Sequence, residues 1–182
     1  MILSKIEPRH RACVIAAVAI VIVGVVIDQA IKHWAQTELI YIGSIPVIEG
    51  LFNLTYVQNT GAAFGILQGQ RVLLSVLVSV IVLGSFYMMF MGMFKHPMLI
   101  ISVALIQSGG IGNLIDRLRF GYVIDYLDFS ALFGFPVFNF ADMCVVGGTF
   151  GVIIYVMFLE QRILEKEKAA ESEQDSEPEG QL

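Results

Sequence analysis

The chain has 182 residues, of which 57% are hydrophobic, and its mean hydropathy is +0.77. A soluble domain of this length could not bury so much apolar surface in one core, so the composition excludes an ordinary soluble protein and indicates that lipid covers part of the chain. The net charge of −5 reflects acidic residues gathered near the C-terminus, so the rest of the chain gives no reason to expect a nucleic-acid partner.

Taken in chain order, the apolar runs predict four transmembrane helices. The predicted spans lie at about residues 12–31, 72–94, 97–115 and 143–159. A bilayer core requires about 20 helical residues, and the second and third runs satisfy this length without interruption. The first run reaches it only by continuing through Asp28 toward Lys32, which places a carboxylate inside the hydrocarbon or at its edge.

The distribution of Lys and Arg around the spans predicts which side of the membrane each end occupies. Most of the basic residues fall on one side, at Lys5, Arg9, Arg11, Lys95, Arg162, Lys166 and Lys168. We therefore expect both termini to be cytoplasmic. A cleaved signal peptide is the alternative for the N-terminus, but "VIDQAIKHW" continues the helix and no small-x-small cleavage site follows it.

Two segments lie on the outer side of the predicted spans, at about residues 33–70 and 118–141. Both combine β-branched and aromatic residues with Gly and Pro, which favours short strands. Residues 163–182 are polar and charged, so we expect an acidic, disordered cytoplasmic tail. The expected fold class is membrane all-α: a four-transmembrane-helix bundle with a small extracytoplasmic β-rich segment and loop, forming one membrane-embedded domain over residues 1–162.

Polar residues at membrane depth converge on the outer side. They come from the first span, the third span, the start of the fourth span and both outer segments: Asp28, Asn59, Asn113, Asp116, Arg117, Asp125, Asn139 and Asp142. A charge at the bilayer centre costs about 2.5–3.5 kcal/mol on insertion scales, and such residues usually mark a functional site. Asn113, Asp116 and Arg117 also share a helix face, because they are three and four residues apart. The convergence predicts a site at the outer membrane surface.

Several of these residues also have a purely structural interpretation. Asp116 beside Arg117 would serve as an ion-paired anchor at a helix end. Asp28 would pair with Lys32 one turn later, as helix stabilisation alone. The sequence leaves these alternatives open for each residue taken singly, and only the convergence argues for function.

The same holds for the start of the fourth span. Asn139 would cap this helix, with Asp142 favoured by the positive end of the helix dipole. Asn59 with Gly61 would form only a turn. Asp125 fits a structural role least well, because "YVIDYL" surrounds it with large apolar residues and offers no basic neighbour.

Other chemistries and other classes of function fit less well. The histidines are scattered over both sides of the membrane and no H-E-x-x-H occurs, which argues against a metalloprotease. Ser108 has no apparent His or Lys partner at its depth. A transporter or proton relay would place ionisable groups in the inner half of the membrane as well. A non-catalytic assembly or lipid-binding subunit stays open, since "GGIG" and "VVGGTFG" would support helix packing in any of these proteins.

Five motifs resemble those of the lipoprotein signal peptidase family, also called signal peptidase II. They are "DQAIKHW", "NTGAAFG", "GGIGNLIDRL", "GYVIDYLDF" and "FPVFNFAD", and they extend over about residues 20–160. The last three, in this order and spacing on a chain of this size, are highly specific. The resemblance implies a multi-pass protein of the bacterial cytoplasmic (inner) membrane with its active site facing outward.

Carried over motif by motif, the resemblance implies that Asp125 and Asp142 are the catalytic aspartates. It implies supporting or substrate-binding roles for the remaining polar residues of the site: Asp28, Asn59, Asn113, Asp116, Arg117 and Asn139. One departure is Met143, where the family usually has Ser after the second aspartate. The change removes a hydroxyl near the carboxylates, and we expect it to tune activity without abolishing it.

Within this set we expect two kinds of role. Our hypothesis is that Asn113, Arg117 and Asn139 orient the catalytic pair and the substrate backbone. Asp28 and Asp116 are expected to hold the structure, with Asp116 paired to Arg117.

The reaction implied by the resemblance is removal of the signal peptide from a diacylglyceryl-modified prolipoprotein, with the cut on the N-terminal side of the lipidated cysteine. Two close carboxylates in a poorly solvated site share one proton, so that one acts as general base on a water and the other as general acid. This chemistry needs no metal or organic cofactor. The expected partners are the prolipoprotein substrates and membrane lipid, and we expect the protein to act as a monomer.

Overall fold

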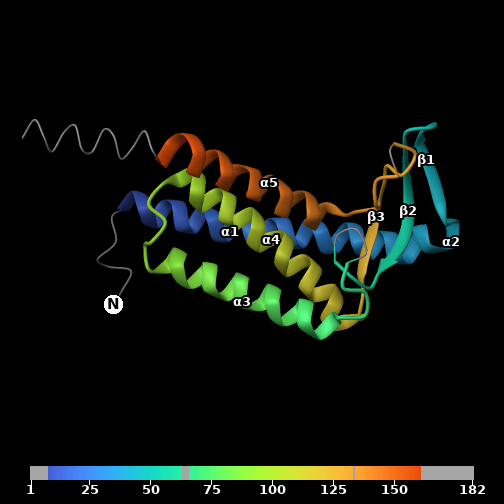
Figure 1. Cartoon of the computed structure of the whole chain (residues 1–182), viewed down its shortest axis with the longest axis horizontal. Helices are drawn as coiled ribbons and strands as arrows, with labels where there is room; N and C mark the ends of the chain where they lie inside the picture. The colour runs from blue at the N-terminus through green and yellow to red at the C-terminus, as the bar shows by residue number, and fades with distance from the viewer. Residues whose placement is uncertain (1–7, 63–65, 133, 161–182) are drawn as a thin grey trace, which may run out of the picture.

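The computed structural model describes residues 8–62, 66–132 and 134–160, and the predicted acidic tail at 163–182 lies outside them. Helices that are long and apolar enough to cross a membrane occur at His10–Ile42, Arg71–Phe90, Pro97–Arg119 and Phe140–Leu159. The prediction of a mostly helical protein with four candidate spans is confirmed. These helices lie side by side over most of their length (Figure 1).

The helical elements follow the chain in a simple order. They are α1 (Pro8–Trp34), the π-helical turn η2 (Ala35–Leu39), α2 (Ile40–Ile42), α3 (Arg71–Phe90), α4 (Pro97–Arg119), α5 (Phe140–Ile154) and the π-helical end η4 (Tyr155–Glu160). The start of helix α4 is determined by its sequence. Pro97 occupies its first turn, and the His96 side chain accepts a hydrogen bond from the Met98 backbone N–H at 3.2 Å.

The first helix is longer than its apolar run indicates. We expected the outer segment to begin at about residue 33, but residues 33–42 are helical, so this boundary was wrong. Ala35 and Leu39, one turn apart, are fully buried in an apolar cluster with Ile124 and Tyr126. Packing against this cluster stabilises the helix beyond the length that the bilayer alone would require.

Helix α4 is the centre of the bundle and contacts α1, α3 and α5. Half of the apolar window of α4 is buried, compared with 11–28% for the other candidate spans. The large apolar side chains of α1, α3 and α5 are mostly exposed, which is the arrangement expected when lipid surrounds three helices packed around a fourth.

Glycines allow α4 and α5 to approach closely. A Cβ atom at Gly109 of α4 would meet the Ala141 carbonyl oxygen, and one at Gly148 of α5 would meet the Ser102 carbonyl oxygen. Without side chains at these two positions, the helix backbones come into direct contact, as small residues allow in membrane bundles.

Gly147 and Gly148 form a matched pair for testing this contact. Gly148→Ala is expected to lower the free energy of unfolding by about 1–3 kcal/mol, because its Cβ would also lie 2.7 Å from Ile106 Cγ1. Gly147→Ala meets nothing within 4 Å, so we expect a change of about 0.5 kcal/mol or less. Unfolding of both purified variants in the same detergent measures the difference, and equal stability would show that the helices can separate at no cost.

Beyond the helices lies a three-stranded antiparallel sheet in the order β1-β2-β3. Its strands are β1 (Ser44–Ile48), β2 (Phe52–Asn59) and β3 (Val123–Asp128). The short strands predicted for both outer segments are confirmed. In the register of β2 and β3, Val57 is opposite Asp125 and Asn59 is opposite Val123.

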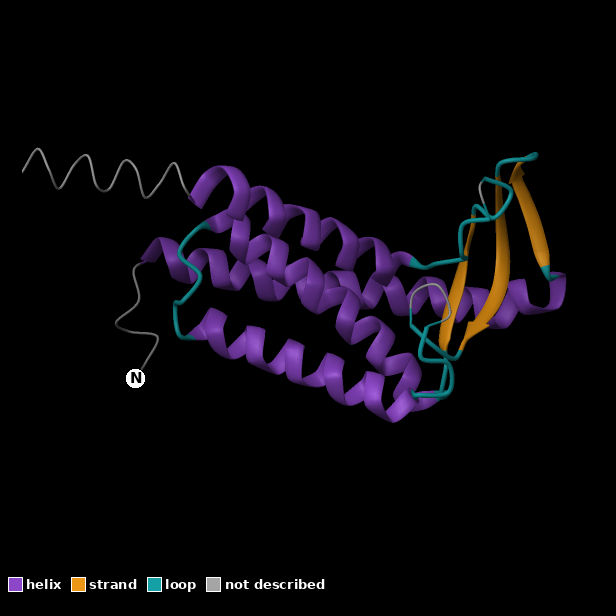
Figure 2. Ribbon diagram, in the orientation of Figure 1, coloured by secondary structure: helices purple, strands orange, loops and turns teal. Residues whose placement is uncertain are grey.

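The sheet lies at one end of the bundle, next to α2 and the start of α5 (Figures 1 and 2). Strand β3 follows α4 almost directly, and the connection between β3 and α5 returns beside it, pairing Phe138 with Leu127. The loop between α3 and α4 lies at the opposite end of the bundle. All the segments that carry the predicted site residues therefore meet where the helices join the sheet.

Candidate active site

A cavity of about 600 Å³ opens where α4, α5 and the sheet meet. Its lining includes Asn59 from β2, Asn113 and Arg117 from α4, Asp125 from β3 and Asp142 from α5. Five of the predicted site residues are thus brought to one surface from four elements. Asp28, Asp116 and Asn139 are not among the lining residues, and all three are buried.

Asp125 is the more enclosed of the two carboxylates, with 1% of its surface exposed. Its Oδ1 accepts a hydrogen bond from Asn139 Nδ2 at 2.6 Å, and its Oδ2 accepts one from Asn59 Nδ2 at 3.0 Å. Burial, together with the negative charge of Asp142, raises the pKa of Asp125 from its usual value of 3.8 to about 7. The two amide donors oppose this rise but do not cancel it.

Asp142 is half-buried in the first turn of α5. Its Oδ1 accepts a hydrogen bond from Asn113 Nδ2 at 2.7 Å, and its Oδ2 accepts one from the Asn139 backbone N–H at 3.2 Å. Asn139 Oδ1 in turn accepts from the Asp142 backbone N–H at 2.9 Å, which completes a capping box. Asn139 and Asp142 therefore cap α5, as their structural interpretation predicted. Asp142 also lines the cavity, so the cap and the candidate site share these residues.

Two amides connect the carboxylates. Asn139 Nδ2, which bonds to Asp125, also lies 3.2 Å from Asn113 Oδ1, and the other end of the Asn113 amide bonds to Asp142. A continuous hydrogen-bonded path thus runs from Asp125 through Asn139 and Asn113 to Asp142. Such a path fixes the positions of both carboxylates relative to each other.

A buried ion cluster lies behind this path. Lys32 Nζ is 3.0 Å from Asp28 Oδ2, 3.0 Å from Asp116 Oδ2 and 2.8 Å from Asn113 Oδ1. In the part of the chain that the structure describes, the ion-pair partner of Asp116 is Lys32 and not Arg117, so that expected pairing was wrong. Lys32 was missed as a site residue, because its spacing from Asp28 indicated only local helix stabilisation.

The same carboxylates connect the cluster to the sheet and to α5. Asp116 Oδ2 accepts from the Ile124 backbone N–H at 3.1 Å, and Asp28 Oδ1 accepts from the Ala141 backbone N–H at 3.1 Å. Gln29 also bonds to the cluster, donating to Asp116 Oδ1 at 3.0 Å and to Asp28 Oδ2 at 3.3 Å. The neighbours of both catalytic candidates in sequence, Ile124 and Ala141, are therefore anchored to one charged cluster.

Arg117 contacts the loop after β2. Its Nη2 donates to the Gly61 carbonyl at 3.0 Å, and the Gly61 backbone N–H donates to Asn59 Oδ1 at 2.9 Å. The turn expected for Asn59 and Gly61 is therefore present. It also orients the Asn59 amide so that its nitrogen faces Asp125.

The rest of the cavity wall is largely apolar. Phe135, Phe138, Val146 and Met143 line it, and Met143 is 52% exposed. These apolar residues come from the connection before α5 and from the first turns of α5, next to Asp142. Within the described ranges, no three His, Cys, Asp or Glu side chains gather into a cluster that could hold a metal ion.

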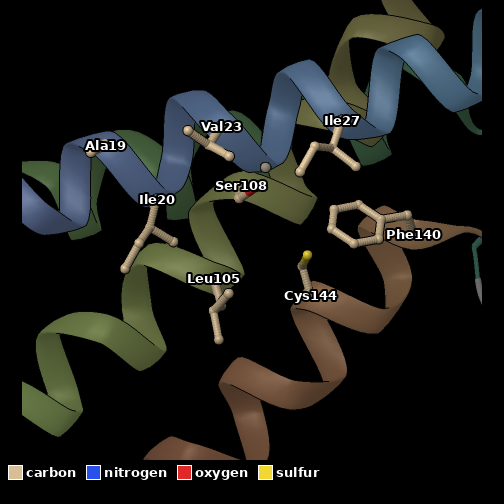
Figure 3. Close-up of a pocket in the computed structure, with 9 residues that line it drawn as sticks. Ala19, Ile20, Val23, Ile27, Leu105, Ser108, Phe140 and Cys144 are labelled. Atoms are coloured by element: carbon tan, nitrogen blue, oxygen red, sulfur yellow. The ribbon is translucent and has the colours of Figure 1, made fainter.

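A second cavity, of about 350 Å³, lies between α1, α4 and α5 (Figure 3). It is lined by Ala19, Ile20, Val23, Gly24, Ile27, Leu105, Ser108, Phe140 and Cys144. These side chains are apolar or weakly polar, and Figure 3 shows Ser108 and Cys144 on different helices. With neither a carboxylate nor a base in its lining, this cavity is a poor candidate for chemistry.

The raised pKa of Asp125 predicts a pH dependence of stability. Folded Asp125 holds its proton up to about pH 7, whereas the unfolded chain releases it near pH 3.8, so stability is greatest at low pH and is lost as the pH rises to about 7. The full difference corresponds to about 4 kcal/mol. Asp125→Asn is expected to remove this dependence. Unfolding of both proteins at pH 5 and pH 8 measures it, and parallel pH profiles would contradict the assignment.

The comparisons with known proteins agree with each other. The family model described as signal peptidase (SPase) II matches residues 20–158. A lipoprotein signal peptidase of Halothermothrix orenii is 43% identical over 137 residues, which is 75% of this chain and 92% of that protein. One of Moorella thermoacetica is 47% identical over 131 residues, covering 70% of this chain and 81% of that protein.

Solved structures are similar as well. One, described as a bacterial membrane enzyme at 2.3 Å resolution, has a TM-score of 0.69 and 27% identity and covers 92% of this chain and 94% of its own. Another, described as a bacterial membrane enzyme at 1.9 Å resolution, has a TM-score of 0.70 and 31% identity, covering 79% of this chain and 94% of its own.

Proposed function

Since this chain belongs to the signal peptidase II family, we propose that Asp125 and Asp142 are its catalytic pair. The protein is an aspartic endopeptidase of the bacterial membrane that removes signal peptides from prolipoproteins. The observation that carries the proposal is the hydrogen-bonded path through Asn139 and Asn113, which holds the two carboxylates at one cavity.

The environments of the two carboxylates support different roles. Asp125 is almost fully buried, and its pKa of about 7 leaves about half of it protonated at neutral pH, far more than for an ordinary aspartate. Asp142 is half-buried at the N-terminus of α5, where backbone and amide donors stabilise a negative charge. In our proposal Asp125 holds the proton that the pair shares and Asp142 is ionised.

Hydrolysis then follows from these two states. Asp142 removes a proton from a water as the water attacks the scissile carbonyl carbon, while Asp125 donates its proton toward the carbonyl oxygen. As the tetrahedral intermediate collapses, the carbon–nitrogen bond breaks and the proton taken up by Asp142 passes to the leaving amine. One hydroxyl of the intermediate returns a proton to Asp125 as the new carboxyl group forms. The pair returns to its starting protonation state, so no external acid or base is consumed.

The shape of the cavity supports a lipid-modified substrate. The polar part holds the carboxylates, and the apolar wall with Phe135, Met143 and Val146 extends onto the first turns of a membrane-spanning helix. A cysteine that carries diacylglycerol joins a peptide bond to two hydrocarbon chains at the membrane surface. We propose that the enzyme cuts on the N-terminal side of this cysteine, with the peptide at the polar part and the lipid against the apolar wall.

The proposed orientation in the membrane has the termini in the cytoplasm and the cavity at the outer face. Lys95, in the loop between α3 and α4, lies at the end of the bundle opposite the sheet (Figure 1). Basic residues at that end support a cytoplasmic position for it. Residues 1–162 would then form one membrane-embedded domain that acts as a monomer.

The proposal for the substrate is tested with the purified protein in liposomes. The same prolipoprotein is presented with and without diacylglycerol on its cysteine, and products are identified by mass spectrometry. We expect release of a protein that begins with the lipidated cysteine, and at least about 10²-fold slower cleavage of the unmodified form, because binding energy from the lipid contributes to the transition state. Equal rates for the two substrates would contradict the proposed role of the apolar wall.

A further inference from the structure

Lys32 is a buried cation that the proposed mechanism does not use. It is 1% exposed, it belongs to α1, and it is not among the residues that line the catalytic cavity. Its ammonium group has three neighbours at hydrogen-bond distance: Asp28 Oδ2, Asp116 Oδ2 and Asn113 Oδ1. Two carboxylates would be enough to neutralise it, so the contact with Asn113 needs its own explanation.

The contact determines which way the Asn113 amide points. An ammonium group can only donate hydrogen bonds, so it faces the oxygen of the amide and not its nitrogen. With Asn113 Oδ1 held at 2.8 Å from Lys32, the amide nitrogen faces Asp142 Oδ1 at 2.7 Å. The orientation of this neutral amide in the catalytic path is therefore set by the charge behind it together with the Asn139 Nδ2 donor, which lies 3.2 Å from the same oxygen.

We propose that Lys32 is a positioning residue for catalysis, which fixes the Asn113 amide so that it donates to Asp142. The inference rests on Asp125 and Asp142 being the catalytic pair. Among the described residues Lys32 bonds to Asn113, Asp28 and Asp116 and to neither carboxylate of the pair, and its charge also lowers the pKa of Asp125 without contact. Its partners Asp28 and Asp116 hold the ammonium group in place.

Removal of Lys32 would weaken the preference of the amide for this orientation and leave Asn139 Nδ2 as the donor to its oxygen. Without the cation, Asp28 and Asp116 keep two uncompensated carboxylates behind the Asn113 amide, and these attract the NH₂ group of its side chain. A flipped amide would direct its oxygen toward Asp142, which loses a hydrogen bond and gains a repulsive contact. Asp142 would then lose the donor that holds its carboxylate in position for proton transfer.

The test is a double-mutant cycle on kcat with Lys32→Met, Asn113→Ala and the variant that combines them. Lys32→Met is expected to reduce kcat by about 10²-fold, since a misplaced group near the reacting atoms costs this much. KM is expected to stay within about twofold, because Lys32 does not line the cavity. In the Asn113→Ala background, Lys32→Met is expected to change kcat by about twofold or less. Losses that multiply in the combined variant would overturn the proposal.

Gln29→Met is the matched control for disturbing the cluster. Gln29 bonds to Asp28 and Asp116 as Lys32 does, and its side-chain partners do not include Asn113. We expect this variant to be less stable but to keep kcat within about threefold of the parent. A fall in kcat as large as that of Lys32→Met would show that any damage to the cluster stops catalysis, and the proposal would fail.

Loss of folding is controlled by Lys32→Met combined with Asp116→Asn, which keeps the net charge of the cluster as in the parent. This variant is expected to be folded and to show the same low kcat with an unchanged KM, and a parent-like kcat would overturn the proposal.

Asp142→Asn distinguishes a failure of the proposed catalytic pair from a failure of the proposed role of Lys32. If Asp142→Asn still cleaves, the catalytic pair is wrong, whereas an inactive Asp142→Asn with additive Lys32 and Asn113 effects rejects only the role of Lys32.

Discussion

Asp142→Asn and Asp125→Asn are each expected to lower kcat for prolipoprotein cleavage by about 10³-fold or more. A positioned general acid or base contributes about 10²–10⁴-fold, and neither role can be filled by an amide. The two losses are expected not to multiply in the double variant, because the carboxylates act as one unit. Substrate binding should change little, so the variants are expected to hold prolipoprotein without cutting it.

Asp128→Asn provides the matched control on the same strand. Asp128 is also a buried carboxylate of β3, but it bonds to Thr55 Oγ1 at 2.7 Å and the Ser130 N–H at 2.9 Å and is not among the residues that line the cavity. We expect its kcat to match that of the parent. Single-turnover cleavage of a diacylglyceryl-modified prolipoprotein, followed by gel shift, measures all of these variants. Cleavage that survives Asp142→Asn or Asp125→Asn would show that other residues carry the catalysis.

Asn139→Ala is expected to reduce both stability and activity strongly. Asn139 is fully buried and takes part in bonds to Asp125, Asn113 and Asp142. Loss of the helix cap costs about 1 kcal/mol, and leaving buried partners unsatisfied costs about 1–3 kcal/mol more. Loss of the donor to Asp125 also leaves the carboxylates of the proposed pair less precisely positioned, so we expect kcat to fall by about 10²-fold.

Asn139→Ser separates the cap from the site. A serine hydroxyl caps a helix about as well as an asparagine amide, but it cannot reproduce the amide donor that reaches Asp125. We expect Asn139→Ser to recover about 1 kcal/mol of the stability lost in Asn139→Ala and to stay as inactive. Unfolding in detergent and single-turnover cleavage are measured on the same preparations. Recovery of activity with the cap would mean that Asn139 serves the helix alone.

The sequence was sufficient to predict the coarse architecture. Hydropathy located the four candidate spans, because the bilayer requires a certain length of apolar helix and such a run is visible in the sequence. The Gly- and Pro-punctuated segments indicated strands, which the sheet confirms. The convergence of polar residues also predicted which side chains would gather, because membrane depth restricts them to one level once the topology is known.

The features that the sequence did not predict depend on contacts between segments far apart in the chain. The helix continues to Ile42 because Ala35 and Leu39 pack against the sheet, and no local pattern reports this. Arg117 bonds to a backbone carbonyl, at Gly61, and any residue would offer that acceptor. Lys32 was visible beside Asp28, but its second carboxylate comes from another helix, so the sequence offered only a local ion pair.

The length of the first helix makes the candidate site sensitive to the thickness of the surrounding bilayer. Its 33 residues from His10 to Ile42 would extend about 50 Å, whereas the hydrocarbon core is about 30 Å thick. The projecting end supports the sheet that carries Asp125, while Asp142 belongs to the separate helix α5. A bilayer of different thickness tilts long and short helices by different amounts. The hydrogen-bonded path that joins the two proposed catalytic carboxylates has to withstand this difference in tilt, so we expect the cleavage rate to depend on the acyl-chain length of the lipid.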